Sequence, residues 1–406
     1  MSNKFDVRPA RAEEMDQLGL MGAYSYAGAF GDGSDNIVRN TQRPEWTLCA
    51  FDGDLMVTSF AAFPFTVRAQ NNTLSYAGIT AVGTRPEYRR RGLLRKIMTQ
   101  AFINQRENGQ AVAGLWASQA AIYRRYGFSA MGANRAYAVD TVDLNLIEPA
   151  GDNVKIERLP AQEGLKKAKA IYQDFVEPRF GYLHRGTPIW QRTIMGETAE
   201  TGPLWMALAS IDDQPCAYVI YSLRSGKVDH PARSQEIVIK DLAWLNISAY
   251  KALWEYLAAH DLVGRIAWHN APTDDPLPEL VHEPRMLRQV DQEASWFRVV
   301  DAATALAARG YDCEGQLSIE VRHDALTPWN DGVWLLDYSP DGSTVTQITG
   351  KADLTMSSTG LSALFTGTRR VSDLVHFGLV QGEAKHLHRW DQVFATRYAA
   401  HCPDHY

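Results

Sequence analysis

Residues 82–98, which read VGTRPEYRRRGLLRKIM, place three consecutive arginines directly before a glycine. A glycine at the start of a helix lets the backbone approach a ligand without a Cβ in the way. The N-terminus of a helix carries unpaired N–H groups and a partial positive charge, so phosphate binds there readily. Guanidinium groups add attraction and direct hydrogen bonds to phosphate oxygens. The pattern around Gly92 therefore indicates a pyrophosphate site, with a solvated basic helix start as the alternative.

The residues on either side of this turn predict the elements that position it. The run TLSYAGITAV before it is rich in β-forming residues, and the run AVAGLWA at residues 111–117 has the length of a strand. Between them, apolar residues recur at helical spacing from Gly92 to about Asn108. A strand, a helix and a second strand in this order predict two parallel strands in one sheet. A hairpin around Gly53 and a short helix stopped by Gly127 complete an expected α+β unit.

The same order of elements returns further along the chain. Residues 146–155 predict a linker, and a strand–turn–strand, a strand EIVIKDLAW, a helix SAYKALWEYLAAH and a strand GRIAWHN follow it. This second copy reads DLAWLNISAYKAL where the first reads RRRGLL, so we expect it to lack the anion site. From about Asp301 a third segment begins with a helix and continues with strands and further helices. We therefore expect domains over residues 1–148, 149–300 and 301–406.

Composition argues against several other classes of function. The chain has 406 residues, 45% of them hydrophobic, which is enough for two or three domains. Its formal net charge of −6 argues against broad nucleic-acid binding, and no run approaches the roughly 20 apolar residues that span a bilayer. Its four cysteines are scattered without CxxC spacing, and its histidines have no zinc-like spacing. We expect a reduced, cytoplasmic protein that needs no metal.

Several motifs together resemble one family. The turn RRRGLL resembles motif A of the Gcn5-related N-acetyltransferases (GNAT), Arg/Gln-x-x-Gly-x-Gly/Ala, except that Leu94 replaces the last small residue. RRRGLLR followed by LWAS and IYRRYGF is similar to the enhanced intracellular survival (Eis) family, as are DPLPELVHEPRML, ALAARGYD and ADLTMSSTGLSALFTG. This resemblance covers nearly the whole chain. It implies an α+β protein with two tandem GNAT-like domains, the second without a cofactor site, followed by a domain like sterol carrier protein.

The resemblance implies that acetyl-CoA binds in the first domain. Its pantetheine arm would pair with the backbone at the end of the strand before the turn, and its pyrophosphate would lie in the turn. The residues implied for this co-substrate are Val82, Gly83, Thr84, Arg89, Arg90, Arg91, Gly92, Leu93, Leu94, Arg95, Ser118 and Gln119. Without the family, Ser118 and Gln119 are read as an ordinary helix cap.

The resemblance also implies two catalytic groups. Tyr123, in IYRRYGF, would donate a proton to the departing thiolate of CoA, and Tyr126, three residues on, is its rival on the same helix face. The general base implied is the C-terminal carboxylate of the chain, that of Tyr406. Chain ends are usually frayed, which argues against such a role. Asp404 and His405 are competing bases close by in the sequence.

We therefore expect an acetyl-CoA-dependent N-acetyltransferase that transfers the acetyl group directly to an amine of a cationic small-molecule acceptor. The resemblance implies aminoglycosides as acceptors and a homohexamer. Two rivals stay open, namely acetylation of a protein lysine or a small polyamine, and a non-enzymatic protein that binds an apolar ligand in its third domain. Asp32 and Asp35, on the loop AFGDGSDN, would line an acidic acceptor pocket or form a plain turn.

Overall fold

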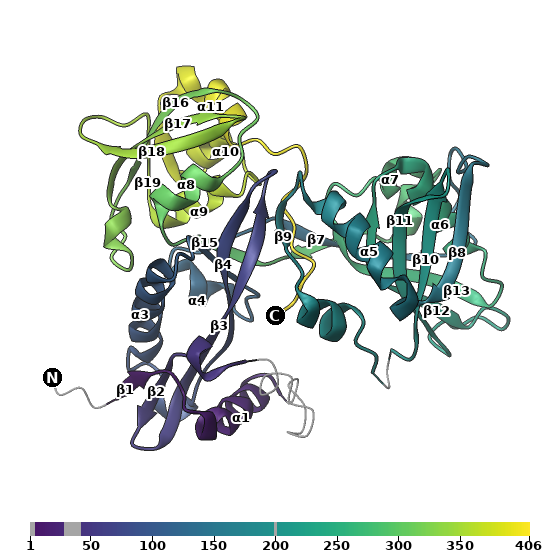
Figure 1. Ribbon diagram of the computed structural model, residues 1–406, viewed down its shortest axis with the longest axis horizontal. Coiled ribbons are helices and arrows are strands. Elements are labelled where there is room, and N and C mark those ends of the chain that lie inside the picture. Colours follow the sequence, from purple (N-terminus) through teal and green to yellow (C-terminus); the bar gives the residue numbers. More distant parts are fainter. Residues whose placement is uncertain (1–4, 28–41, 199–200) are drawn as a thin grey trace. The chain divides into compact units, whose positions relative to one another are not determined.

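The computed structural model describes residues 5–27, 42–198 and 201–406. The chain forms two compact units (Figure 1). Unit 1 contains Met1–Met131, Ser295–Thr396 and Tyr406, and unit 2 contains Gly132–Ala294 and Arg397–His405. Each unit therefore gathers segments that are far apart in the sequence.

Unit 1 is built on a mixed sheet. Its strands, in spatial order, are β1 (Asp6–Arg8), β2 (Cys49–Asp52), β3 (Leu55–Ala69), β4 (Thr73–Thr84), β5 (Val112–Leu115), β15 (Trp296–Val299) and β6 (Ser129–Ala130). The helices of this part are α1 (Met15–Ser25), α3 (Leu93–Glu107) and α4 (Ala120–Arg124). β4 and β5 are parallel, so the crossover predicted from the strand–helix–strand order is confirmed.

Helix α3 occupies the span that its apolar periodicity predicted. Its buried residues Leu93, Ile97, Met98 and Phe102 join one core cluster with side chains of the sheet. Burying each such side chain contributes about 1.5–3 kcal/mol. This packing holds the first turn of α3 at the end of β4, where the arginine-rich turn leads into it.

The third segment of the chain adds a second, smaller sheet to unit 1. Its strands, in spatial order, are β18 (Gly342–Ile348), β17 (Gly332–Ser339), β16 (Gly315–Val321), β19 (Leu354–Met356) and β20 (Val380–Gly382). The helices of this segment are α8 (Ala302–Ala308), α9 (Ser358–Phe365), α10 (Val371–His376) and α11 (Leu387–Val393).

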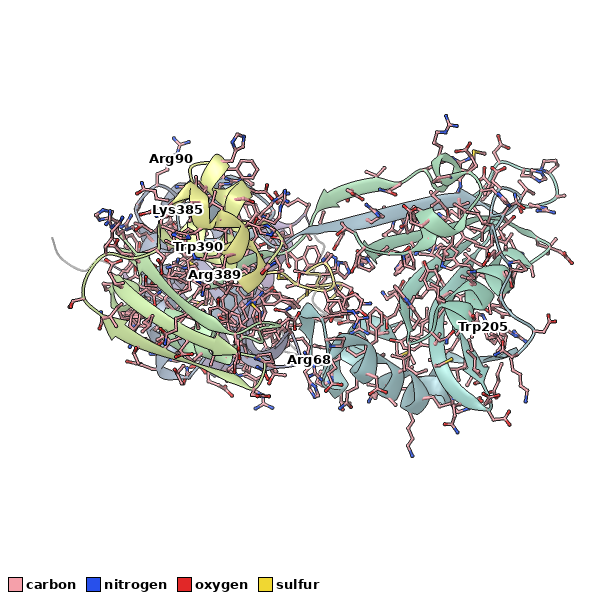
Figure 2. The ribbon with its side chains drawn as sticks, turned by 90° about the horizontal axis from the view of Figure 1, so that it is seen from above. Arg68, Arg90, Trp205, Lys385, Arg389 and Trp390 are labelled. Carbon is pink, nitrogen blue, oxygen red and sulfur yellow. The ribbon has the colours of Figure 1, made fainter. Side chains whose placement is uncertain are left out.

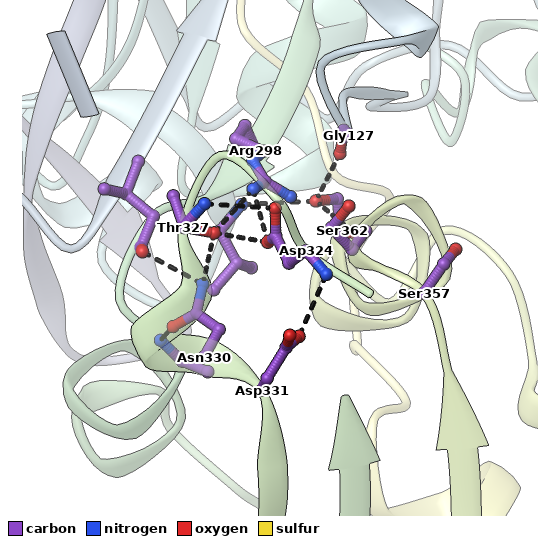
Figure 3. Close-up of polar contacts among 12 residues, drawn as sticks. Gly127, Arg298, Asp324, Thr327, Asn330, Asp331, Ser357 and Ser362 are labelled. Carbon is purple, nitrogen blue, oxygen red and sulfur yellow. Dashed lines mark hydrogen bonds and ion pairs between the residues drawn. The ribbon is translucent and has the colours of Figure 1, made fainter. Parts of the chain in front are cut away.

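A buried polar cluster joins this segment to the main sheet of unit 1 (Figure 3). Arg298 on β15 donates to Asp324 at 2.5 Å and to Thr327 at 2.8 Å, and the Arg298 side chain is fully buried. Ser362 of α9 donates to the carbonyl of Gly127 at 2.9 Å. A buried charge costs several kcal/mol unless it is paired in this way. The cluster therefore fixes the third segment to the end of the first α+β unit.

Unit 2 is built on another mixed sheet. Its strands, in spatial order, are β14 (Val290–Glu293), β7 (Ala133–Asp140), β13 (Val263–Pro272), β12 (Gln235–Trp244), β11 (Gln214–Arg224), β10 (Leu204–Ile211) and β8 (Val154–Pro160). Unit 2 also contains β9 (Phe180–Leu183), α5 (Ala161–Val176), a π-helical turn (Ile189–Ile194), α6 (Ile247–Ala258) and α7 (Leu277–Leu280). β12 and β13 are parallel and are joined through α6, as in the first copy.

Two strands belong to a sheet other than the one formed by the segments next to them in the sequence. β7, within residues 1–148, pairs with β13 and β14 in unit 2. β15, within residues 149–300, pairs with β5 and β6 in unit 1. The compact units therefore differ from continuous stretches of chain, while the α+β class expected from the sequence is confirmed. In the described residues, none of the helices combines the length and the apolar composition needed to cross a membrane.

Candidate active site

The parallel strands β4 and β5 separate at one end. Their pairing runs from Tyr76 opposite Val112 to Ile79 opposite Leu115, and β4 then continues alone on this side to Thr84. A bulge accompanies the separation, because Ala81 has φ +51° and the pairing of β3 with β4 shifts register at this point. The end of β4 thus presents backbone amide groups that a second extended chain of atoms can pair with.

Two tyrosines lie near this open end of β4. The hydroxyl of Tyr26 donates to the carbonyl of Val82 at 3.2 Å. Tyr123, on α4, is only 4% exposed, and its hydroxyl makes no hydrogen bond among the described residues. Burial raises the pKa of Tyr123 well above its ordinary value, and the neighbouring phenols of Tyr26 and Tyr126 add to this. Tyr123 therefore stays protonated at neutral pH with a donor hydrogen to give.

Tyr126 has a different environment from Tyr123. Burial raises its pKa as well, but the guanidinium groups of Arg125 and Arg95 oppose the rise. Arg95 lies in the first turn of α3, so Tyr126 faces the basic turn. The two tyrosines expected to compete for one role are thus distinguished by their neighbours.

The turn expected to hold the pyrophosphate ends at the N-cap of α3. Gly92 occupies this position with φ +76°, and no side chain caps the helix. A Cβ on Gly92 would meet nothing within 4 Å, so no neighbouring atom excludes a larger residue. Glycine is favoured here because it adopts the left-handed conformation without strain, and it leaves the space before the helix open. The first N–H groups of α3 and its dipole therefore face open space, beside a buried Leu93 and a half-buried Leu94.

The three arginines of this turn have different tasks. Arg89 donates to the carbonyl of Thr84 at 3.1 Å, and Arg91 donates to the carbonyl of Glu87 at 2.8 Å, so both brace the turn. Arg90 is exposed, has φ +61° and makes no hydrogen bond or ion pair within the described part of the chain. Figure 2 shows its side chain extending outward. Arg90 is therefore placed to meet a ligand from solvent.

Ser118 and Gln119 follow the end of β5 and are exposed. Because β4 and β5 are parallel, these residues share an edge of the sheet with Val82 and Gly83. Gln119 stands at the N-cap of α4, but its side chain makes no capping hydrogen bond. The side chain of Gln119 therefore does not cap α4, contrary to the alternative interpretation of this residue.

Tyr406 lies in a cradle of aromatic side chains in unit 1. Its hydroxyl and that of Tyr76 share a hydrogen bond of 2.5 Å, and its ring meets that of Phe65 edge to face, with centroids 5.3 Å apart. Gly78 and Gly114, opposite each other on β4 and β5, make room for these rings. A Cβ on Gly78 would lie 3.1 Å from the ring of Tyr406, and one on Gly114 would collide with the hydroxyl of Tyr76. Tyr406 is thus held beside β4.

Sequence reasoning missed this cradle. The available signal is the pair of glycines inside two buried strands, since glycine in a strand marks a close approach of other groups. In the sequence, Gly78 and Gly114 lie within runs of β-forming residues, and nothing in the pattern marks Tyr76. The structure brings Tyr406 to the same strand as Val82, and it leaves the rival Asp404 in unit 2, fully engaged by an arginine.

Other residues singled out in the sequence give no site here. Asp32 and Asp35 lie outside the described residues. Among the residues that the structure describes, no group of three or more His, Cys, Asp or Glu side chains could hold a metal ion. Helix α6, the counterpart of α3 in unit 2, begins after Asn246, whose side chain accepts hydrogen bonds from the N–H groups of Ser248 and Ala249. That helix end satisfies its own donors.

The fold and this site define the class of protein. Residues 6–131 and residues 181–299 each match a family model described as an acetyltransferase (GNAT) domain, and residues 302–403 match a sterol carrier protein domain. In fold, the chain is similar to a GCN5-related N-acetyltransferase from Anabaena variabilis, with a TM-score of 0.86 and 24% identity over 99% of this chain and 100% of the other. The protein is an N-acetyltransferase of the GNAT superfamily, with two GNAT domains followed by a sterol-carrier-like domain.

Within this class the chain has relatives in Streptomyces and Mycobacterium. The chain is 32% identical over 310 residues to an uncharacterized N-acetyltransferase of Streptomyces coelicolor, covering 75% of this chain and 74% of the relative. It is 27% identical over 332 residues to the N-acetyltransferase Eis of Mycobacterium tuberculosis, covering 80% and 79%. Its fold resembles that of Eis1 from Mycobacterium abscessus, with a TM-score of 0.83 and 24% identity over 99% and 100% of the two chains. The Eis N-acetyltransferase of Mycobacterium tuberculosis is therefore a homologue of this chain.

Proposed function

We propose that this protein transfers an acetyl group directly from acetyl-CoA, bound at the open end of β4, to an amine of a cationic polyamine such as an aminoglycoside. The observation that carries the proposal is the combination of an interrupted strand pair with an uncapped helix N-terminus at Gly92. An extended amide chain that ends in a diphosphate needs these two features at one edge of a sheet. Four free cysteines in the chain agree with action in the reduced cytoplasm.

Acetyl-CoA fits the residues present. The backbone of Val82, Gly83 and Thr84 would pair with the pantetheine arm, and Ser118 and Gln119 would close the slot on the side of β5. The backbone N–H groups from Gly92 onward, with Arg90 and Arg95, would hold the pyrophosphate. The co-substrate supplies a thioester whose carbonyl a backbone N–H near Val82 would polarise.

The proton transfers in the proposal use two groups of this chain. Tyr123 would hold its proton until negative charge develops on the leaving sulfur, and then donate it. Burial raises the pKa of the Tyr123 hydroxyl, but the same burial disfavours a thiolate beside it, so the transfer remains favourable. The carboxylate of Tyr406 would attract the acceptor's ammonium group and accept its proton, directly or through water. Its unperturbed pKa of roughly 3.3–3.7 makes it a weak base, so attraction is the larger part of its role.

A panel of amines tests the proposal through release of CoA. We expect turnover with aminoglycosides and other polyamines, and its loss when one residue is appended after Tyr406. We expect Tyr123→Phe to lower kcat by about 100-fold or more, because general acid catalysis contributes at least that much. Tyr126→Phe is the matched control and should leave kcat within a factor of about three. Equal losses in the two variants would remove Tyr123 from its role.

The acceptor class has one serious rival. If a peptide with an exposed lysine or a short polyamine is acetylated with higher kcat/KM than every aminoglycoside tested, the acceptor in the proposal is wrong while the transfer chemistry stands. The homohexamer implied by the family and the domain limits 1–148, 149–300 and 301–406 are part of the proposal. Mass measurement in solution tests the first.

A further inference from the structure

The second GNAT domain repeats the open strand pair of the first. β12 and β13 pair from Gln235 opposite Val263 to Ile239 opposite Trp268, although β12 continues to Trp244 and β13 to Pro272. The pairing of β11 with β12 shifts register between Ile239 and Asp241, next to the point of separation. Unit 2 therefore has a slot of the same construction as the one that we propose for acetyl-CoA in unit 1.

The chain's own segment 397–405 lies at this slot. His401 is 1% exposed, and its Nε2 lies 3.1 Å from the carbonyl oxygen of Asn270, which is on β13 beyond the last residue that pairs with β12. Its backbone N–H donates to the carbonyl of Phe180 at 3.0 Å. The backbone N–H of Ala399 donates to Asp274 at 2.9 Å. The segment thus binds one side of the slot through both backbone and side-chain groups.

Arg185 ties the segment to the other side of the slot. Its two terminal nitrogens donate to the carboxylate of Asp241, on β12 beyond the separation, at 2.7 and 3.0 Å. Its Nε donates to both oxygens of Asp404, at 2.9 and 3.2 Å. The three side chains are 0%, 7% and 1% exposed. Tyr218 donates to Asp241 at 2.6 Å, and the ring of Tyr172 lies 4.0 Å below the guanidinium.

The chemistry of this slot suits a peptide and not a second acetyl-CoA. The donors at the start of α6 are used by Asn246, which removes the place for a diphosphate. Two carboxylates share one guanidinium, and burial raises the pKa of Asp404 to about 6. Every guanidinium nitrogen of Arg185 already donates to a carboxylate, and the segment itself brings one of the two carboxylates, that of Asp404.

We infer that the second GNAT domain has become a dock for the segment 397–405, and that Arg185 and Asp241, acting through Asp404, are positioning residues for the carboxylate of Tyr406. Two residues span at most about 7 Å between Cα atoms. Fixing Asp404 therefore confines Tyr406 to a small volume, which removes the fraying expected of a chain end. The inference rests on the proposed role of Tyr406 in the reaction.

The test uses Asp404→Asn in the full chain, because this variant leaves Arg185 and Asp241 as a balanced pair. We expect kcat to fall at least tenfold while KM for acetyl-CoA stays within a factor of about two. Amide hydrogen exchange in residues 397–405, followed by mass spectrometry, should become at least tenfold faster. Asp291→Asn is the matched control, since it removes a carboxylate paired with Arg135 elsewhere in unit 2 and should change neither reading.

Arg185→Lys provides a second, independent variant. It keeps the charge but loses the fork that serves two carboxylates at once, so exchange in 397–405 should again accelerate. The docking is overturned if exchange in this segment is unchanged in both variants. The positioning role is overturned if exchange accelerates but kcat does not fall, or if kcat and KM worsen together as general destabilisation would make them.

Failure of the dock is distinguishable from failure of the proposed function. If appending a residue to Tyr406 abolishes turnover while Asp404→Asn has the kcat of the parent chain, Tyr406 acts as proposed and the dock is wrong. If the appended residue has no effect on turnover, the proposed role of Tyr406 is wrong, and the positioning role falls with it.

Discussion

Replacing Gly92 by alanine tests the phosphate turn against a control in the same helix. Gly92 precedes α3 with φ +76°, and Gly109 follows the same helix with φ +72°. A Cβ would meet nothing within 4 Å at either position. The two substitutions therefore impose the same backbone strain without a steric clash in the free protein.

The expected magnitudes separate strain from lost binding. A left-handed conformation costs an L-residue about 1–2 kcal/mol, and the stiffer unfolded chain returns about 0.4–1 kcal/mol, so each variant should lose about 1 kcal/mol of unfolding free energy. At Gly92 the new methyl group also occupies the space in front of the helix N–H groups. Weakening one charge-assisted hydrogen bond to a phosphate oxygen costs about 2 kcal/mol, which is about 30-fold in affinity.

Urea unfolding and steady-state kinetics give the two readings. We expect equal losses of stability in the two variants, a rise of about 30-fold in KM for acetyl-CoA for Gly92→Ala, and no rise for Gly109→Ala. The kcat of Gly92→Ala at saturating acetyl-CoA should stay near that of the parent, because the turn is remote from the transferred group. A KM that changes less than threefold at Gly92, or that rises equally in both variants, would refute the proposed phosphate site.

Three further predictions concern buried groups. Burial raises the pKa of Asp275 to about 7, so the folded chain keeps a proton that the unfolded chain releases above about pH 4. The free energy of unfolding should therefore fall by up to about 4 kcal/mol between pH 4 and 7. In Asp275→Asn, urea unfolding over this pH range should show a smaller fall. Tyr76→Phe and Tyr406→Phe should each lower kcat up to about tenfold, and the double variant should match one single variant, which a double-mutant cycle measures. Gly114→Ala should displace the Tyr76 hydroxyl and match Tyr76→Phe in kcat; a kcat equal to the parent's would show that the cradle does not influence the reaction.

Local signals in the sequence predicted much of the architecture. The helix from Gly92 follows from a repeating apolar face, and the parallel strands follow from the strand–helix–strand order, because both depend on neighbours within a few tens of residues. The exchange of β7 and β15 between the sheets could not be predicted in this way. The alternating pattern of a strand such as β7 indicates which of its faces is buried, but it does not indicate which sheet the strand will join.

The site shows the same division. The turn around Gly92 was predicted because glycine and arginine carry the chemistry in their own types. The pair Arg185 and Asp404 was not found, because 219 residues separate the partners and each alone is an ordinary surface residue type. The cradle of Tyr406 was missed for a related reason: its signal is the absence of side chains at Gly78 and Gly114, and such a signal gains meaning only when the two strands are placed side by side.

The two GNAT domains share a separated pair of parallel strands but differ in the N-cap residue of the helix that follows the first of these strands. Under the proposed function, this residue decides whether the helix N-terminus can bind a phosphate. Every α-helix begins with N–H groups that need a partner, and a side chain and a ligand compete for the same donors. At α3 the cap is Gly92, which has no side chain to offer, so the donors remain for an anion. At α6 the cap is Asn246, which uses them itself. Changing Asn246 to glycine alone would therefore not create a second cofactor site, since the slot beside it is already engaged by Asp404 through Arg185.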